Sequence, residues 1–386
     1  MKAKIAIVYD RLNVAHGGAE QVVLALQKLY PQATLFGSVY DPKEAVWAAP
    51  FSPQTTFLQK IPWATKFHRY LAIFMPLAFE FLDLSTFDVV ISVTSAEAKG
   101  LITRRDQLHL CYLLSPPRYL YHYQDEYLRK NRFLNLSFMR PLVKITLNYL
   151  KKWDQQAIFR PDLVIPIAEV VGKRAKKYYK NLEPAKVIYP PVEASLLAEV
   201  DTTSKTIEDY LLLVARLVPY KNIDAAILAC EKIGQKLVIV GEGPEAERLE
   251  KMLRTKLIGF RKKLSRAELA QLYQGCRAVL SLGLDDFSIS ALEANLFGKP
   301  VIINQLAGAA ELIKHRKHGL HLPFTEGDQP RKISQNLIDS LNLLAKIKFE
   351  PQQLQQNALK YDTSKFALNF AKAVRAAHQA KIEGKL

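Results

Sequence analysis

Residues 210–221 read YLLLVARLVPYK, an apolar run of strand length followed by two cations on either side of a proline. A short apolar run bounded by turn residues is typical of a buried strand, and Asn222 is a plausible cap for a helix from Ile223. The same order of strand, loop and helix recurs along the chain. Strands are expected at residues 3–9, 88–92, 108–112, 162–165, 210–215, 236–240, 278–281 and 300–303. Alternating strands and helices predict an α/β fold with parallel, doubly wound sheets.

The alternation pauses at residues 193–208, which are polar and lack a strong periodicity. A domain boundary is therefore expected near Val192. The 386 residues allow two or three domains of roughly 150 residues each. We expect one α/β domain at residues 1–192, a second at 193–360, and a helix at 361–386 that packs back toward the first.

The composition restricts the partners. Lysine and arginine number 54 against 37 acidic residues, a formal charge of +17 that attracts anions. Nucleic acid is not expected, because no recognition-helix or RNP-like pattern accompanies the charge. The remaining candidate partners are phosphorylated small molecules and an anionic membrane.

The three cysteines, Cys111, Cys230 and Cys276, are widely spaced, which indicates a reduced cytoplasmic setting without a zinc site. The first ten residues are too short for a signal peptide. No uncharged apolar run reaches the roughly 18 residues of a membrane span.

Two loops that follow strands carry candidate anion-binding groups. Gly17 and Gly18 open a helix, where the backbone can approach a ligand and free N–H groups favour an anion; a plain glycine turn is the alternative. Arg216 and Lys221 lie on either side of Pro219 and provide the fork and the point charge that suit a diphosphate. Solvated surface charge is the alternative there.

A third candidate segment is residues 285–300. Ser288 is expected to cap a helix that ends near Gly298. Glu293 falls on the apolar stripe of that helix, so its carboxylate needs a partner. A ribose with two hydroxyl groups would serve, and so would an internal arginine or lysine.

Two weaker patterns resemble a dinucleotide site and a metal site, and we expect neither. Gly241-Glu242-Gly243 imitates a dinucleotide fingerprint, but the acid about twenty residues further on is missing. Asp285-Asp286 suggests a metal, but no histidine lies at ligand spacing. Neither a nicotinamide cofactor nor a metal is predicted.

Together these segments resemble the GT-B glycosyltransferases of family 4, over nearly the whole chain. Gly17–Glu20 is similar to the family's amino-terminal glycine motif, and residues 76–84 resemble its bacterial mannosyltransferases. Arg216 and Lys221 match the family's phosphate-binding pair. Residues 285–293 match its E-x7-E motif, and residues 298–302, Gly308 and Glu311 follow in the usual places.

The resemblance implies two Rossmann-like domains facing a central cleft, the first for the acceptor and the second for the nucleotide-sugar. It implies a retaining transfer without an obligatory metal or cofactor. The donor would be GDP- or UDP-linked, with mannose favoured, and the acceptor a lipid-linked or other saccharide in cell-surface polysaccharide synthesis. The implied catalytic residues are Asp285, Arg216 and Lys221. The implied donor-binding residues are Gly17, Gly18, Arg216, Lys221, Asp285, Phe287, Ser288, Ile289 and Glu293.

The chain departs from the family at three positions. Asp285 replaces the first glutamate of E-x7-E, and Ser95 and Leu114 stand where many relatives have histidine. The alternative function is therefore a non-catalytic, membrane-associated protein that keeps the nucleotide site.

A membrane role is also suggested by residues 118–180, which contain fourteen basic and five acidic residues. Basic helices with aromatic side chains suit an anionic headgroup surface, whereas the alternative is a solvated helical face around a core. The hypothesis places the protein in the cytoplasm, peripheral on the inner face of the membrane. The interleaved aromatic residues are Tyr119, Tyr121, Tyr123, Tyr127, Phe133, Phe138, Tyr149 and Trp153.

Overall fold

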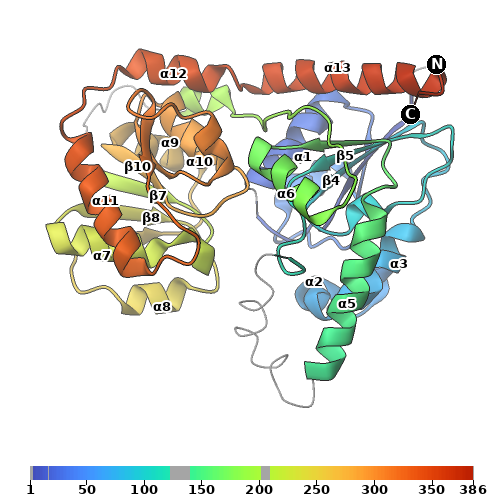
Figure 1. The fold of residues 1–386 in the computed structure, drawn as a ribbon, viewed down its shortest axis with the longest axis horizontal. Coiled ribbons are helices and arrows are strands. Elements are labelled where there is room, and N and C mark those ends of the chain that lie inside the picture. Colours follow the sequence, from blue (N-terminus) through green and yellow to red (C-terminus); the bar gives the residue numbers. More distant parts are fainter. Residues whose placement is uncertain (1–2, 16, 122–139, 201–208, 386) are drawn as a thin grey trace. The chain divides into compact units, whose positions relative to one another are not determined.

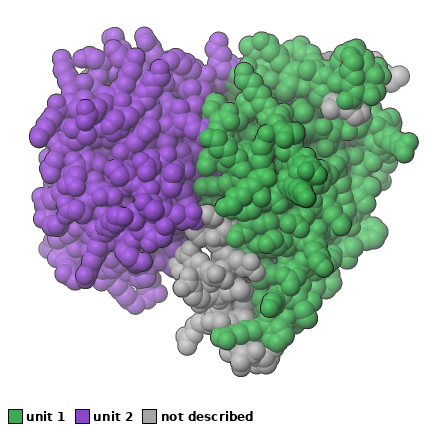
Figure 2. All heavy atoms as spheres, in the orientation of Figure 1, with its two compact units in different colours: residues 1–189, 366–386 green, residues 190–365 purple. Residues whose placement is uncertain are grey.

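The computed structural model describes residues 3–385 except 16, 122–139 and 201–208. The chain divides into two compact units, coloured separately in Figure 2. Unit 1 consists of residues 1–189 and 366–386, and unit 2 of residues 190–365. Each unit contains one six-stranded parallel sheet, which confirms the predicted α/β fold class.

The sheet of unit 1 has the strand order β3-β2-β1-β4-β5-β6. Every residue of the two central strands β4 and β5 is buried, as expected of a parallel sheet covered on both faces. The strands are β1 (Ile5–Tyr9), β2 (Thr34–Gly37), β3 (Gln54–Thr55), β4 (Val89–Thr94), β5 (Leu108–Leu113) and β6 (Leu163–Pro166). The α-helices of its first 189 residues are α1 (Gly18–Leu29), α2 (Ala64–Phe67), α3 (Met75–Glu80), α5 (Arg140–Ala157) and α6 (Glu169–Tyr178).

The carboxy-terminal helix α13 (Thr363–Ile382) begins in unit 2, and its residues from Phe366 onward belong to unit 1. Phe366 and Phe370 pack edge-on against Tyr112 of β5, with ring centroids 5.9 and 5.8 Å away. Near its far end Lys381 pairs with Asp162 at 2.6 Å. A buried aromatic cluster and an ion pair therefore attach the end of the chain to the first sheet.

Unit 2 repeats the arrangement with the strand order β12-β11-β10-β7-β8-β9. Figure 1 shows α7 beside α11, and α10 packs on α12. The strands are β7 (Tyr210–Val214), β8 (Lys236–Val240), β9 (Ile258–Arg261), β10 (Ala278–Ser281), β11 (Val301–Asn304) and β12 (Gly319–Leu322). The helices are α7 (Ile223–Ile233), α8 (Ala246–Lys251), α9 (Arg266–Gly275), α10 (Ile289–Leu296), α11 (Pro330–Leu344) and α12 (Pro351–Leu359).

Both sheets reverse their strand order beside their first strand. In unit 1 the reversal lies between β1 and β4, and in unit 2 between β7 and β10. Loops at the carboxyl ends of two such strands diverge and leave room for a ligand. The fold thus directs attention to the loops after β7 and β10, and after β1 and β4.

Candidate functional site

The loops at the reversal point of unit 2 carry most of the predicted site residues. Arg216 and Lys221 follow β7, and Asp285 and Ser288 follow β10. Lys221, Asp285 and Ser288 line one small hollow, together with Ser281, Gly283 and the ends of the two strands. The structure therefore brings together cationic and anionic groups that are 64 positions apart in the chain, as the numbering of Lys221 and Asp285 gives.

Lys221 and Asp285 form an ion pair, with Nζ 2.7 Å from Oδ1. Their side chains are only 17% and 8% exposed, so the pair is largely removed from water. Gly283 leaves room for it, since a Cβ there would lie 2.8 Å from Cδ of Lys221 and 3.1 Å from the carboxylate oxygens. Asp285 thus holds the predicted phosphate-binding ammonium in a fixed place.

Arg216 is exposed on a loop that the neighbouring loop holds in place. The N–H of Leu217 donates to the carbonyl of Glu242 at 2.8 Å, and the N–H of Glu245 donates back to Leu217 at 3.1 Å. A Cβ on Gly241 or Gly243 would overlap backbone atoms of the Arg216 loop. These glycines therefore bring two loops together, a role that the dinucleotide-like pattern did not reveal.

Two expected helix caps are wrong. Ser288 and Asn222 stand before α10 and α7, but neither side chain caps the helix, because both residues have left-handed backbone angles, with φ of 87° and 52°. The Ser288 hydroxyl lies 2.6 Å from that of Ser281, and the Asn222 amide donates to the carbonyl of Leu282 at 3.0 Å. Both side chains tie the site loops to the end of β10. Backbone strain of this kind is common at binding sites.

The residues after Asp285 differ in accessibility. Phe287 is 5% exposed, and its carbonyl accepts from the N–H of Ala309 at 2.8 Å. Its side chain supports the loop from inside, whereas Ile289, the first residue of α10, is half-buried.

Glu293 lies in the second turn of α10, and its partner is neither arginine nor lysine. The hydroxyl of Tyr273 donates to Oε2 at 2.6 Å, and the Tyr273 ring stacks on Phe297 with centroids 5.4 Å apart. Burial raises the pKa of Glu293, and the Tyr273 hydrogen bond offsets part of that rise. An expectation of an internal cationic partner is wrong; the ribose contact stays a prediction.

Gly17 and Gly18 lie at the start of α1 in unit 1. Gly17 precedes the helix in extended conformation, and a Cβ there would lie 3.0 Å from Oε2 of Glu20. Glu20 is buried and accepts a hydrogen bond from Tyr9 at 2.6 Å. The other predicted site residues belong to unit 2, so the contribution of the two glycines to the same site stays a prediction.

The reversal point of unit 1 holds a polar network that the sequence reasoning missed. The buried carboxylate of Asp10 accepts hydrogen bonds from the Thr94 hydroxyl and the Ser95 N–H, both at 2.7 Å, and from the Ala98 N–H at 3.0 Å. Asp10 therefore shapes the loop that carries Ser95. A carboxylate directly after an apolar strand was the available signal. Leu114, the other departure from the family, is buried.

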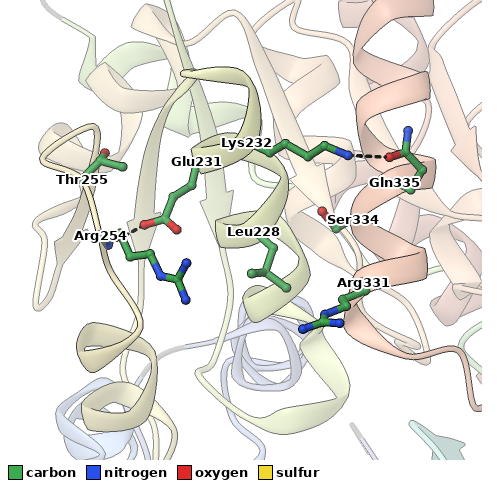
Figure 3. Close-up of a pocket in the computed structure, with 8 residues that line it drawn as sticks. All are labelled: Leu228, Glu231, Lys232, Arg254, Thr255, Arg331, Ser334 and Gln335. Atoms are coloured by element: carbon green, nitrogen blue, oxygen red, sulfur yellow. Dashed lines mark hydrogen bonds between the residues drawn. The ribbon is translucent and has the colours of Figure 1, made fainter.

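A second hollow in unit 2, of about 520 Å³, is lined by none of the predicted residues. Figure 3 shows it between α7 and α11, beside residues 254–255. Lys232 donates to Gln335 at 2.9 Å, and the backbone N–H of Arg254 donates to Glu231 at 2.6 Å. Its position away from the carboxyl ends of β7 and β10 gives no reason to link it with the candidate site.

Comparison with solved structures defines the class of fold. HepE of Anabaena, in complex with UDP and glucose, is 17% identical, with a TM-score of 0.66 over 97% of this chain and 100% of HepE. Sucrose-phosphate synthase from Thermosynechococcus elongatus is 14% identical, with a TM-score of 0.71 over 98% of this chain and 100% of its own. The two parallel sheets thus have the GT-B fold of these proteins.

A match to a known family lies in unit 2. Residues 199–359 match the family described as glycosyl transferases group 1. An uncharacterized glycosyltransferase of Methanocaldococcus jannaschii is 34% identical over 125 residues, which is 29% of this chain. That match spans 31% of the curated relative.

Proposed function

We propose that the chain is a retaining glycosyltransferase that moves a hexose from a GDP- or UDP-sugar to a lipid-linked or other saccharide acceptor in cell-surface polysaccharide synthesis. Mannose is the favoured sugar. Unit 2 would bind the nucleotide-sugar, and unit 1 would bind the acceptor. The observation that carries the proposal is the enclosed Lys221–Asp285 pair at the strand-order reversal of unit 2, the unit that matches the group 1 glycosyl transferases.

In the proposed reaction Arg216 and Lys221 bind the diphosphate of the donor. The diphosphate gains charge as the bond to the sugar breaks, so cations already in place stabilise the transition state more than the ground state. Asp285 keeps Lys221 oriented and faces the sugar. No metal is required for this division of roles.

Two observations favour different donors. The residues 76–84 that resemble bacterial mannosyltransferases favour GDP-mannose. The UDP and glucose bound in HepE favour a uridine donor. Both donors therefore belong in every assay.

We expect Asp285→Asn to lower turnover while affinity for the free nucleoside diphosphate does not fall. The free nucleotide lacks the sugar that Asp285 would face, and removal of a carboxylate near the phosphates removes a repulsion. A misplaced contact of about 1 Å can cost on the order of a hundredfold in rate. Turnover with GDP-mannose and UDP-glucose, and nucleotide binding by calorimetry, would measure the two effects.

The neighbouring Asp286→Asn variant is the matched control, because it changes the same charge one residue away. A fully active Asp285→Asn enzyme would remove Asp285 from the site. If Asp286→Asn alone lost turnover, the role would belong to Asp286. Nucleotide binding without turnover in the unaltered protein would instead favour the non-catalytic alternative.

Glu293 predicts a specific pH dependence of nucleotide affinity. Its carboxylate form would accept hydrogen bonds from the ribose hydroxyls, so affinity should fall as pH drops through its raised pKa. The stability of unit 2 should have the opposite pH dependence and be higher at low pH. The native state binds this proton more tightly than the unfolded state, so the free energy of unfolding falls as pH rises through the same window.

Calorimetric titrations between pH 4 and 8, about the range where a glutamate with a raised pKa titrates, would measure the dependence. Glu293→Gln should bind more weakly and lose the pH dependence assigned to this group. An unchanged pH profile in Glu293→Gln would remove Glu293 from the ribose site.

A further inference from the structure

An unusual number of large apolar side chains is exposed on one part of unit 1. In the described part of the chain, nine of the 21 such side chains fall within residues 57–81. Six of them, which we call the aromatic face, are between 39% and 75% exposed. The aromatic face consists of Trp63, Phe67, Tyr70, Phe74, Leu77 and Phe81.

Helix α5 carries a second exposed apolar stripe. Leu142, Ile145 and Tyr149, spaced three and four residues apart, are 55%, 66% and 41% exposed. The opposite side of α5 is attached to the same segment. Leu147 and Leu150 form a buried cluster against which Ala72 packs. Trp153 of α5 donates to Glu80 of α3 at 2.7 Å, and Figure 1 shows these two helices side by side. We call the three exposed residues the α5 stripe.

The charges around this surface are mostly positive. Between Glu44 and Glu80 the sequence contains no aspartate or glutamate, but it has Lys60, Lys66 and Arg69. Helix α5 adds four more cations and one acid, Asp154, which is buried against Lys99. An apolar surface bordered mainly by cations, with the exposed Asp83 beside Phe81 as an exception, complements an anionic lipid surface. The α5 cations are Arg140, Lys144, Lys151 and Lys152.

Trp63 has the most unusual conformation on the aromatic face. Its φ is 58°, in the left-handed region that a bulky residue rarely adopts, and its side chain is 71% exposed. The other two indoles donate hydrogen bonds within unit 1, Trp47 to Val14 at 3.1 Å and Trp153 to Glu80 at 2.7 Å. A strained tryptophan that is mostly exposed contributes little to the interior, which makes its indole a candidate for a contact outside the chain.

The membrane hypothesis from residues 118–180 needs a correction. Tyr119 donates to Glu97 at 2.7 Å, and Tyr121 donates to Asp154 at 2.8 Å and stacks on Tyr178. These rings, like that of Trp153, serve the interior of unit 1. Tyr123, Tyr127, Phe133 and Phe138 lie outside the described residues. Among the described aromatic residues of that stretch, only Tyr149 is exposed on the proposed surface.

We propose that the aromatic face and the α5 stripe form a docking surface for an anionic lipid bilayer. Aromatic side chains lie at the headgroup level of a membrane, and the flanking cations meet the lipid phosphates. A second copy of the chain is a poorer occupant, since the cations around this surface would face the same cations of the other copy. No helix among the described residues is long and apolar enough to cross a membrane, and peripheral docking requires none. That the docked chain meets a lipid-linked acceptor rests on the proposed function; the docking itself does not.

Sedimentation with lipid vesicles tests the surface, using phosphatidylcholine alone and an equal mixture with phosphatidylglycerol, at low salt and without donor. The full chain should sediment with the anionic vesicles only. Phe67→Ser combined with Phe81→Ser should weaken binding by about tenfold or more. The control is Ile382→Ser, which removes a 69% exposed apolar side chain from α13 in the same unit and should change nothing.

A second variant distinguishes loss of vesicle binding from loss of folding. Trp63→Gly removes the indole but suits the left-handed backbone, so it should bind vesicles less without lowering the unfolding temperature. Equal recovery with neutral and anionic vesicles, or full binding by the Phe67 and Phe81 double variant, would overturn the proposal. So would self-association of the chain that the double variant abolishes. Vesicle binding without transferase activity would leave the docking surface standing and count against the proposed function alone.

Discussion

Lys221→Ala is expected to weaken binding of UDP or GDP by roughly 1.5–3 kcal/mol, the range for a charge-assisted contact. This equals about a 10- to 150-fold loss of affinity. We expect the upper part of the range, because the variant also leaves the buried Asp285 carboxylate unpaired beside the phosphates. Arg216→Ala should lie in the lower part, because Arg216 is exposed and water screens its charge.

Calorimetric titration of both variants would measure these losses. Lys332→Ala is the matched control in unit 2, since Lys332 also pairs with an aspartate, Asp328, at 2.8 Å, but on helix α11. Its nucleotide affinity should equal that of the unaltered protein. Unchanged affinity in both Lys221→Ala and Arg216→Ala would remove the diphosphate from this site.

Lys99→Met is expected to destabilise unit 1 by about 3–5 kcal/mol, the cost of breaking a buried ion pair. Lys99 and Asp154 approach to 2.5 Å with 0% and 1% exposure, and Tyr121 donates to the same carboxylate. Without Lys99 the carboxylate stays buried without a cation beside it. Urea unfolding of the full chain would measure the loss.

Two further variants separate the ion pair from general damage. Lys99→Met combined with Asp154→Leu should recover much of the stability, because an apolar pair of similar volume needs no compensating charge. Lys176→Met removes one partner of an exposed pair with Glu183 and should cost at most about 1 kcal/mol. A loss in Lys99→Met no larger than in Lys176→Met would contradict the assignment.

The fold was predictable where the sequence contains long apolar runs. Strands β4 and β5 consist of six buried residues each, and such runs identify central parallel strands. Strand β3 was missed because it has only two residues, and β2 and β12 were missed because one of their four residues is glycine, which weakens the strand pattern. An edge strand as short as β3 is defined by its pairing with β2, which no local pattern encodes.

The candidate site was predictable in its residue types but not in its contacts. Placement after strands identified Lys221 and Asp285, yet their direct pairing depends on strands β7 and β10 being neighbours. The cap predictions for Ser288 and Asn222 failed because they assumed an extended residue before each helix, and both backbones are left-handed. The partner of Glu293 was missed because Tyr273 comes from a separate helix, α9.

The central claim is that unit 2 binds a nucleoside diphosphate between Arg216, Lys221 and Glu293. Thermal unfolding of the full chain with UDP, GDP and ADP in parallel tests it most directly, because a ligand of the native state stabilises it by about 2.7 kcal/mol at a hundred times its dissociation constant. We predict a rise in unfolding temperature with UDP or GDP that exceeds the rise with ADP and is much smaller in Lys221→Ala. No rise with any nucleotide, or an equal rise in Lys221→Ala, would contradict the claim.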